Sequence, residues 1–427
     1  MPPSASPVPR SFLSPTPILL TALAVGTALS PTSTKIAGIT WLAWCLWGLA
    51  LRLAPRAGRP LLPHPALPAV HAWAAGCGAA MGFCMLKAGY WSDPLDEVYG
   101  QLRLLLAAAA AWWVLTRAVL PGGLRPAIGD ALAAQGGFAL AWVVWVFTQY
   151  DDPRRFLPSN AIPWAHAVAF GLCLSMPLAL HADGQPRWRR RLWWAGLALG
   201  CAAVLTSQSR GAFGVFAWML WLLVARWRQV HGHWPVRRLA MLAAGACVAA
   251  AAVWCAPGDP LRVRMAEHEI ALAERGTAYD TSLGTRLYLW NMALQGLRES
   301  PWVGVGEAER MRRIHRAGDE LPAQRREGLA VIRTMGHVHN QYLHSALDGG
   351  IVGLAGLLAV MAGLAVAAWR LRRVDRLAAW QMQGLLFVHG VGGLTNVNFV
   401  HNYYVVTLSM AAAIVLLGVR RSPAPAA

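Results

Sequence analysis

Long apolar segments recur along most of the chain and are separated by short polar connections. Twelve of them have about the length of helix that crosses a bilayer of roughly 30 Å. They cover residues 12–31, 36–54, 66–86, 102–121, 128–149, 161–182, 192–208, 211–225, 239–256, 349–369, 377–396 and 402–419. This pattern predicts an all-α polytopic membrane protein with about twelve transmembrane helices, the first of which is retained and not cleaved as a signal peptide.

One polar segment is too long to be a simple connection between spans. Within it, residues 262–275 have the spacing of an amphipathic helix, residues 284–299 predict a second helix, and residues 301–306 (PWVGVG) predict a turn. A long ordered loop on a rigid scaffold is a usual place for function. The predicted units are residues 1–256 with nine spans, residues 257–340 as a partly helical loop, and residues 341–427 with three spans and a tail.

Positive charges determine the predicted orientation of these spans. Arginine strips such as those at residues 187–191 and 370–376 lie in alternating connections, and the connections between them carry few cations. Membrane proteins keep such strips on the cytoplasmic side. Both termini are therefore predicted to be inside, which places the loop at 257–340 outside.

Composition excludes several other classes of protein. Apolar residues make up 56% of the chain and charged residues 14%, which is unusual for a soluble protein of this length. The formal net charge of +18 lies in short strips and not on one basic face with interleaved aromatic residues, so we expect no nucleic-acid binding. The seven cysteines show no CxxC spacing, so neither a disulfide nor a zinc site is expected.

Two arginines near the outer face are candidates for binding an anion. Arg210, in SQSRGAFG, lies in the break between two apolar segments, where a cation is costly and small neighbours such as Ser209 leave room for a ligand. Arg286 lies in the first turn of the helix predicted at 284–299, where the helix dipole favours an anion. By position alone, Arg210 is explained equally well as a snorkelling arginine at a helix end. Taken singly, Arg286 is better explained as a surface ion pair with one of the loop acids.

A third candidate lies where the loop re-enters the membrane, in HVHNQYLHSALDGGIVGL. The imidazole of His339 can be neutral and accept a proton, and Asn340 beside it could orient a ligand or the ring. Gly349, Gly350 and Gly353 allow close approach of backbone at the start of the next span. An interfacial histidine followed by packing glycines is the alternative interpretation.

The spacing of these residues resembles a known signature. His339-Asn340, nine residues, Gly350, two residues and Gly353 are similar to the signature of the O-antigen ligase family, which includes O-antigen polymerases and bacterial O-oligosaccharyltransferases. The SRGAFG block around Arg210 resembles the second block of the family, and TRLYLWNMAL with ESPWVGVG resembles its loop helix and turn. These blocks cover roughly the C-terminal half of the chain.

The resemblance implies a GT-C-like glycosyltransferase of the bacterial inner membrane with a periplasmic active site. Such enzymes move a glycan from undecaprenyl pyrophosphate to an acceptor, here lipid A-core, and Arg210, Arg286 and His339 match the functional residues of the family. General chemistry then suggests His339 as general base and the two arginines as ligands of the departing pyrophosphate, in an inverting reaction without metal or cofactor. Further predicted substrate contacts are Ser209, Asn340, Lys87, Tyr90 and His337.

Several alternatives stay open at this point. The acids Asp93, Asp96, Glu97, Asp151 and Asp152 in outer connections could hold a divalent cation, although local ion pairs with Lys87 or with Arg154 and Arg155 are the favoured interpretation. An O-antigen polymerase or an O-oligosaccharyltransferase would share the same blocks. A lipid-linked glycan transporter is less favoured, because the polar residues gather at the outer face and the chain shows no repeated halves.

Overall fold

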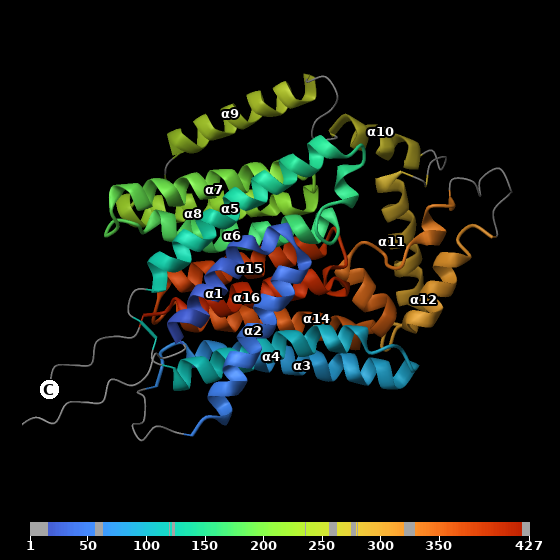
Figure 1. The fold of residues 1–427 in the computed structure, drawn as a ribbon. Coiled ribbons are helices and arrows are strands. Elements are labelled where there is room, and N and C mark those ends of the chain that lie inside the picture. Colours follow the sequence, from blue (N-terminus) through green and yellow to red (C-terminus); the bar gives the residue numbers. More distant parts are fainter. Residues whose placement is uncertain are drawn as a thin grey trace, which may run out of the picture.

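The structure is a computed structural model that describes residues 16–55, 63–118, 120–121, 124–234, 236–255, 263–274, 279, 281–319 and 329–420. These residues are all-α (Figure 1). The longer helices are α1 (Thr16–Leu29), α2 (Thr34–Leu53), α3 (Leu67–Trp91), α4 (Asp96–Arg117), α5 (Leu124–Gln149), α6 (Ala161–Leu180), α7 (Arg187–Thr206), α8 (Gly214–His231), α9 (Val236–Cys255), α10 (Val263–Glu274), α11 (Ser282–Glu299), α12 (Gly306–His315), α14 (Gln341–Leu371), α15 (Arg376–Gly393) and α16 (Asn402–Leu417).

Each predicted span overlaps one helix among these residues, namely one of α1 to α9 or α14 to α16. Six of these helices, α2 to α6 and α14, are long and apolar enough to cross a membrane, and α1 and α16 are shorter apolar helices. The protein is therefore a polytopic membrane protein. The helix α14 begins at Gln341, before the predicted start of the tenth span near residue 349, and it is broken at Gly350. Its polar first turns are buried against other helices.

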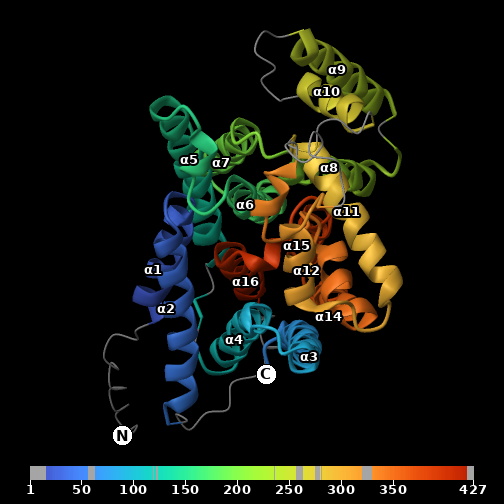
Figure 2. The same cartoon turned by 90° about the vertical axis from the view of Figure 1, so that its right-hand side faces the viewer.

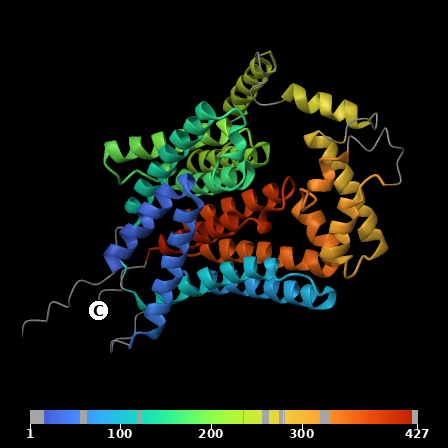
Figure 3. The same ribbon diagram turned by 45° about the vertical axis from the view of Figure 1, so that its right-hand side comes forward.

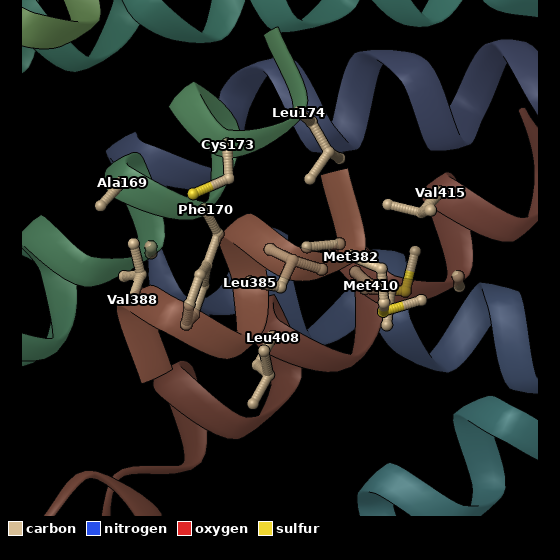
Figure 4. Close-up of a cluster of buried hydrophobic side chains, with 14 of the residues drawn as sticks. Ala169, Phe170, Cys173, Leu174, Met382, Leu385, Val388, Leu408, Met410 and Val415 are labelled. Atoms are coloured by element: carbon tan, nitrogen blue, oxygen red, sulfur yellow. The ribbon is translucent and has the colours of Figure 1, made fainter. Parts of the chain in front are cut away.

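The helices form layers around α6 (Figure 2). Helix α6 contains no charged residue, and 94% of its apolar window is buried, as expected for a helix that is apolar on all sides. It packs against α15 and α16 through side chains that include Phe170 and Leu174, with Leu385 and Leu408 on the facing helices (Figure 4). On the other side of α15 and α16, helices α3, α4 and α14 complete the bundle.

Small residues allow the closest helix contacts. A Cβ atom added to Gly76 of α3 would lie 2.7 Å from Cα of Gly363 of α14, and one added to Gly136 of α5 would lie 2.0 Å from the carbonyl oxygen of Gly196 of α7. Dispersion contacts between closely approaching backbones stabilise helix pairs in membranes, where lipid is as apolar as the side chains. The glycines at these positions therefore explain the tight α3–α14 and α5–α7 pairs.

Helices α11 and α12 lie together at one end of the bundle (Figure 3). They have a small core of their own, which is separate from the core of the bundle. It consists of Leu289, Met292, Ala293, Val305, Ile314, Ala317, Leu329, Ile332, Val338 and Leu347. Leu347 belongs to α14, so this core joins the loop to the membrane helices.

A break in α14 seats the loop on the bundle. Gly350 has φ 58° and ψ −146°, and the turn formed by residues 301–306 lies against it. Val305 N–H donates to the Leu347 carbonyl at 2.8 Å, and Ile351 N–H donates to the Pro301 carbonyl at 2.9 Å. The turn thus takes up backbone hydrogen bonds that a continuous helix would form internally.

Candidate active site

The three predicted site residues come from separate segments and lie in one region of the structure. Arg210 begins the short helix η3 (Arg210–Phe213), Arg286 is in the second turn of α11, and His339 lies in the segment before α14. The positive charges of Arg210 and Arg154 help to lower the pKa of Arg286, and Arg286 in turn helps to lower the pKa of His339. Arg286 is therefore within electrostatic reach of both Arg210 and His339.

The turn that carries Arg210 is held by buried hydroxyl groups. Ser207 donates to the Val204 carbonyl at 2.7 Å, and Ser209 donates to the Ala161 carbonyl at the start of α6 at 2.9 Å. Gln208 between them has φ 54°, a left-handed conformation that is uncommon outside glycine. Because the hydroxyl of Ser209 is committed to this turn, its contact with substrate stays a prediction.

Gly211 allows the same turn to approach the segment between α15 and α16. A Cβ atom at this position would lie 2.2 Å from Oγ1 of Thr395. The segment continues into η6 (Asn398–Val400) and His401, which follow Asn396. The glycine of the SRG block thus brings Arg210 towards residues of the last connection in the chain.

Arg286 is half-buried near the N-terminus of α11. The backbone N–H groups there are already occupied, because Thr281 accepts from Gly284 at 3.1 Å and the buried carboxylate of Glu269 accepts from Leu283 at 2.9 Å. Burial is the largest cause that lowers the pKa of Arg286, followed by Arg210 and Arg154, while Glu269 opposes them. Among the described residues Arg286 forms no ion pair, so its guanidinium has donors to offer a ligand.

His339 lies in a segment without regular secondary structure. Its φ of 54° is strained for a residue with a side chain, and such strain persists only where the surroundings hold the backbone. Trp290 Nε1–H donates to the Val338 carbonyl at 3.0 Å, and Arg310 donates to the Gly336 carbonyl. Asn340 caps α14 by accepting from the N–H groups of Tyr342 and Leu343 at 3.0 and 3.1 Å.

The pKa of His339 is lowered to about 4, mainly by burial and then by the charges of Arg286 and His401, while a hydrogen bond with Asn396 opposes them. We therefore expect its imidazole to be neutral at physiological pH. Its Nδ1 is buried without a hydrogen-bond partner among the described residues, and Nε2 lies 3.5 Å from Sδ of Met335. His337 stacks edge-on against it, with ring centroids 4.3 Å apart, and accepts the His339 N–H at 3.3 Å.

The comparison with known protein families identifies this region. A family model described as O-antigen ligase matches residues 195–358, a range that contains Arg210, Arg286 and His339. The chain contains an O-antigen ligase domain. Residues 195–358 are therefore similar to the O-antigen ligase family. No curated protein matches the chain.

Sequence reasoning missed two residues that the structure brings to the candidate site. Arg154, in η2 (Pro153–Arg155), adds positive charge beside Arg286, and Asn396 lies against His339. The sequence did offer a sign of Arg154, because it is a cation in a predicted outer connection, and the positive-inside rule leaves few cations there. Nothing in the sequence marks Asn396 as a site residue, because its position next to His339 depends on how α15 and α16 pack.

Lys87 and Tyr90, both on α3, lie in different surroundings. The Lys87 ammonium is 6% exposed and 2.5 Å from a carboxylate oxygen of Glu97. Tyr90 is 65% exposed and packs edge-on against Trp91, which is typical of an aromatic residue at a membrane interface. The structure thus gives each a role apart from substrate, and their contacts with substrate stay predictions.

The acids considered as metal ligands have protein partners in the described residues. Glu97, His344 and Asp348 place one ligand atom each within 4.8 Å of one another, as a metal site would. Both carboxylates, however, already contact cations: Lys87 pairs with Glu97 at 2.5 Å, and Arg310 pairs with Asp348 at 2.8 Å. These contacts are those of a buried ion-pair network.

Two of the remaining acids also have local partners. Both carboxylate oxygens of Asp93 accept the Glu307 N–H at 3.1 Å, so Asp93 caps the start of α12. Asp152 pairs with Arg155 at 2.7 Å on the surface. Glu97 and Asp152 thus have the local ion pairs that the favoured interpretation predicted, whereas Asp93 caps a helix instead.

Proposed function

We propose that the protein is an O-antigen ligase that transfers a glycan from undecaprenyl pyrophosphate to a sugar hydroxyl of lipid A-core. The observation that carries this proposal is the position of a neutral, strained His339 beside half-buried Arg286, with Arg210 and Arg154 adding charge. A base and a group of cations at one site match the two needs of transfer from a pyrophosphate. The site would face the periplasm, with both termini in the cytoplasm and twelve helices crossing the inner membrane.

In the proposed reaction the acceptor hydroxyl attacks the anomeric carbon of the glycan. His339 takes the hydroxyl proton as the new carbon–oxygen bond forms. The bond from the anomeric carbon to the pyrophosphate oxygen breaks, and undecaprenyl pyrophosphate leaves with the electron pair. Attack opposite the leaving group inverts the anomeric configuration.

The arginines stabilise the charge that develops on the leaving group. A guanidinium offers planar donors that match phosphate oxygens and does not lose its proton at working pH. Removing one such donor costs roughly 3–4 kcal/mol of transition-state stabilisation. Arg210 and Arg286 can therefore take the place of a divalent cation, and we propose that the reaction needs no metal.

Transfer in detergent with defined undecaprenyl-pyrophosphate glycan and lipid A-core tests the proposal. Arg210→Ala and Arg286→Ala are expected to lower kcat by about a hundredfold to a thousandfold, and His339→Ala to abolish transfer, while all three fold as wild type. Arg298→Ala is the matched control, because Arg298 is an exposed arginine at the other end of α11. Wild-type rates in all three site variants would refute the assignment.

The acceptor separates a ligase from the polymerases of the same family. In cells that lack the gene, a ligase leaves long polymer on the lipid carrier. Loss of a polymerase still allows lipid A-core to receive one repeat unit. The second pattern would show that the acceptor is another carrier-linked glycan.

A further inference from the structure

Five ionisable side chains form a continuous buried row beside the active site. Lys87 of α3 contacts Glu97 of α4, whose other oxygen is 3.5 Å from His344 Nε2 of α14. The same Nε2 is 3.7 Å from Asp348, and Asp348 accepts from Arg310 of α12 at 2.8 and 3.0 Å. The row thus joins three membrane helices to the loop helix α12.

Arg310 ends this row and reaches the backbone of the catalytic segment. Its side chain is 3% exposed, and the guanidinium contacts four groups: Asp348, Glu307 at 3.2 Å, Sδ of Met311 at 3.2 Å, and the Gly336 carbonyl. A planar guanidinium can donate in several fixed directions, which an ammonium cannot do. Because Asp348 is 1% exposed and negatively charged, it compensates the charge that Arg310 carries into the interior.

The segment that holds His339 contains no helix or strand between Met335 and Asn340. It is held to the loop by the buried side chain of Val338 and by hydrogen bonds from Arg310 to the Gly336 carbonyl and from Trp290 to the Val338 carbonyl. The left-handed backbone of His339 is one to three residues away from both carbonyls. Releasing either carbonyl would allow this strained backbone to relax towards an extended or helical conformation.

We propose that Arg310, held by Asp348, and Trp290 are positioning residues that keep His339 in its strained conformation against Arg286. This inference rests on the proposed function, because it assigns the two residues a part in proton transfer by His339. Neither side chain needs to contact substrate. Their effect on the reaction comes from the backbone that they hold.

Arg310→Lys and Trp290→Phe test this proposal in the full-length protein. Lysine keeps a positive charge beside Asp348 but cannot donate to Gly336 at the same time, and phenylalanine keeps the ring but loses the N–H. Each variant is expected to lower kcat by on the order of a hundredfold, the cost of a misplaced catalytic group, with KM for both substrates near wild type. Arg313→Gln is the matched control, since Arg313 lies on the same helix and pairs with Glu299 and Glu309 away from the segment.

Two further measurements distinguish positioning from a general loss of structure. The acid limb of the kcat profile should move to higher pH in both variants, because a released His339 is less buried. Modification of His339 by diethylpyrocarbonate, followed by peptide mass spectrometry, should be faster than in wild type and unchanged in Arg313→Gln. This second measurement needs no turnover.

The outcomes separate the inference from the proposed function. Wild-type kcat and wild-type His339 reactivity in Arg310→Lys and Trp290→Phe would overturn the inference. So would a loss of kcat with an unmoved acid limb and unchanged reactivity, and the proposed function would then stand. If wild type transfers no glycan while both variants make His339 more reactive, the proposed function fails and the positioning of His339 is supported.

Discussion

Replacing Gly350 with alanine tests how the loop is seated on the membrane helices. Gly350 has φ 58° and ψ −146°, a conformation that is essentially restricted to glycine. A Cβ atom there would lie 2.4 Å from the carbonyl carbon of Trp302 and 2.5 Å from the backbone nitrogen of Val303. Both contacts are with backbone, so the overlap cannot be relieved by a change of rotamer.

The loss of unfolding free energy in Gly350→Ala has two contributions. Forcing alanine into this backbone conformation costs about 1–3 kcal/mol. Moving the turn at residues 301–306 away from α14 would also break its three backbone hydrogen bonds, from Val305, Ile351 and Val352, each worth roughly 1 kcal/mol. We therefore expect Gly350→Ala to lower the free energy of unfolding by about 4–6 kcal/mol.

The assay is denaturant-induced unfolding of purified protein in detergent micelles, together with glycan transfer. Gly89→Ala is the matched control, because Gly89 is in α3 with nothing within 4 Å of an added Cβ atom. Alanine in a helix at that position should be neutral or stabilise by up to about 1 kcal/mol. Equal stability and equal transfer in the two variants would refute the view that the break in α14 seats the loop.

Three further predictions concern pH, the buried ion pair and metal. In the proposed mechanism His339 acts as a base in its neutral form, and its pKa is lowered to about 4. The kcat should therefore stay constant from neutral pH down to about pH 5 and fall near pH 4. Arg286→Gln removes a positive charge and should move this acid limb to higher pH, whereas a limb at about pH 6.5 in wild type would show that His339 is solvated. Lys87→Met leaves Glu97 without its ammonium partner and should lower the free energy of unfolding by about 3–5 kcal/mol. The double variant Lys87→Met with Glu97→Gln should recover most of this loss, which a double-mutant cycle would measure. EDTA should leave transfer unchanged, and activity that is lost with EDTA and returns with magnesium would contradict the metal-free proposal.

The hydropathy pattern predicted most of the helical architecture, since a run of apolar residues long enough to span lipid allows few other structures. It failed where polar residues are buried in a helix. The first turns of α14 contain His344 and Asp348, which in sequence look like part of a polar loop. Only their partners Glu97 and Arg310, which are distant in the chain, make a buried helix possible there.

The candidate site was predictable to the extent that each residue lies in a recognisable local motif. Arg210, Arg286 and His339 each follow from such a motif, and the structure brings them together. Arg310 and Trp290 could not be found in this way, because each acts on a carbonyl group of another segment. Every residue has a backbone carbonyl, so the residue type does not reveal which carbonyl accepts such a hydrogen bond.

The small core of the loop has a consequence for how the protein is made. Leu289 and Ile314 belong to helices α11 and α12, whereas Leu347, which packs with them, comes from α14. Chains emerge from the ribosome N-terminus first, so the arginine-bearing helices are synthesised before the residues that complete their core and compensate Arg310. A ribosome that stops after α12 would release a protein that has Arg210 and Arg286 but lacks His339, the proposed general base. Synthesis of α14 is therefore the event that assembles the enzyme, and a nascent chain stays inactive until most of its length has been translated.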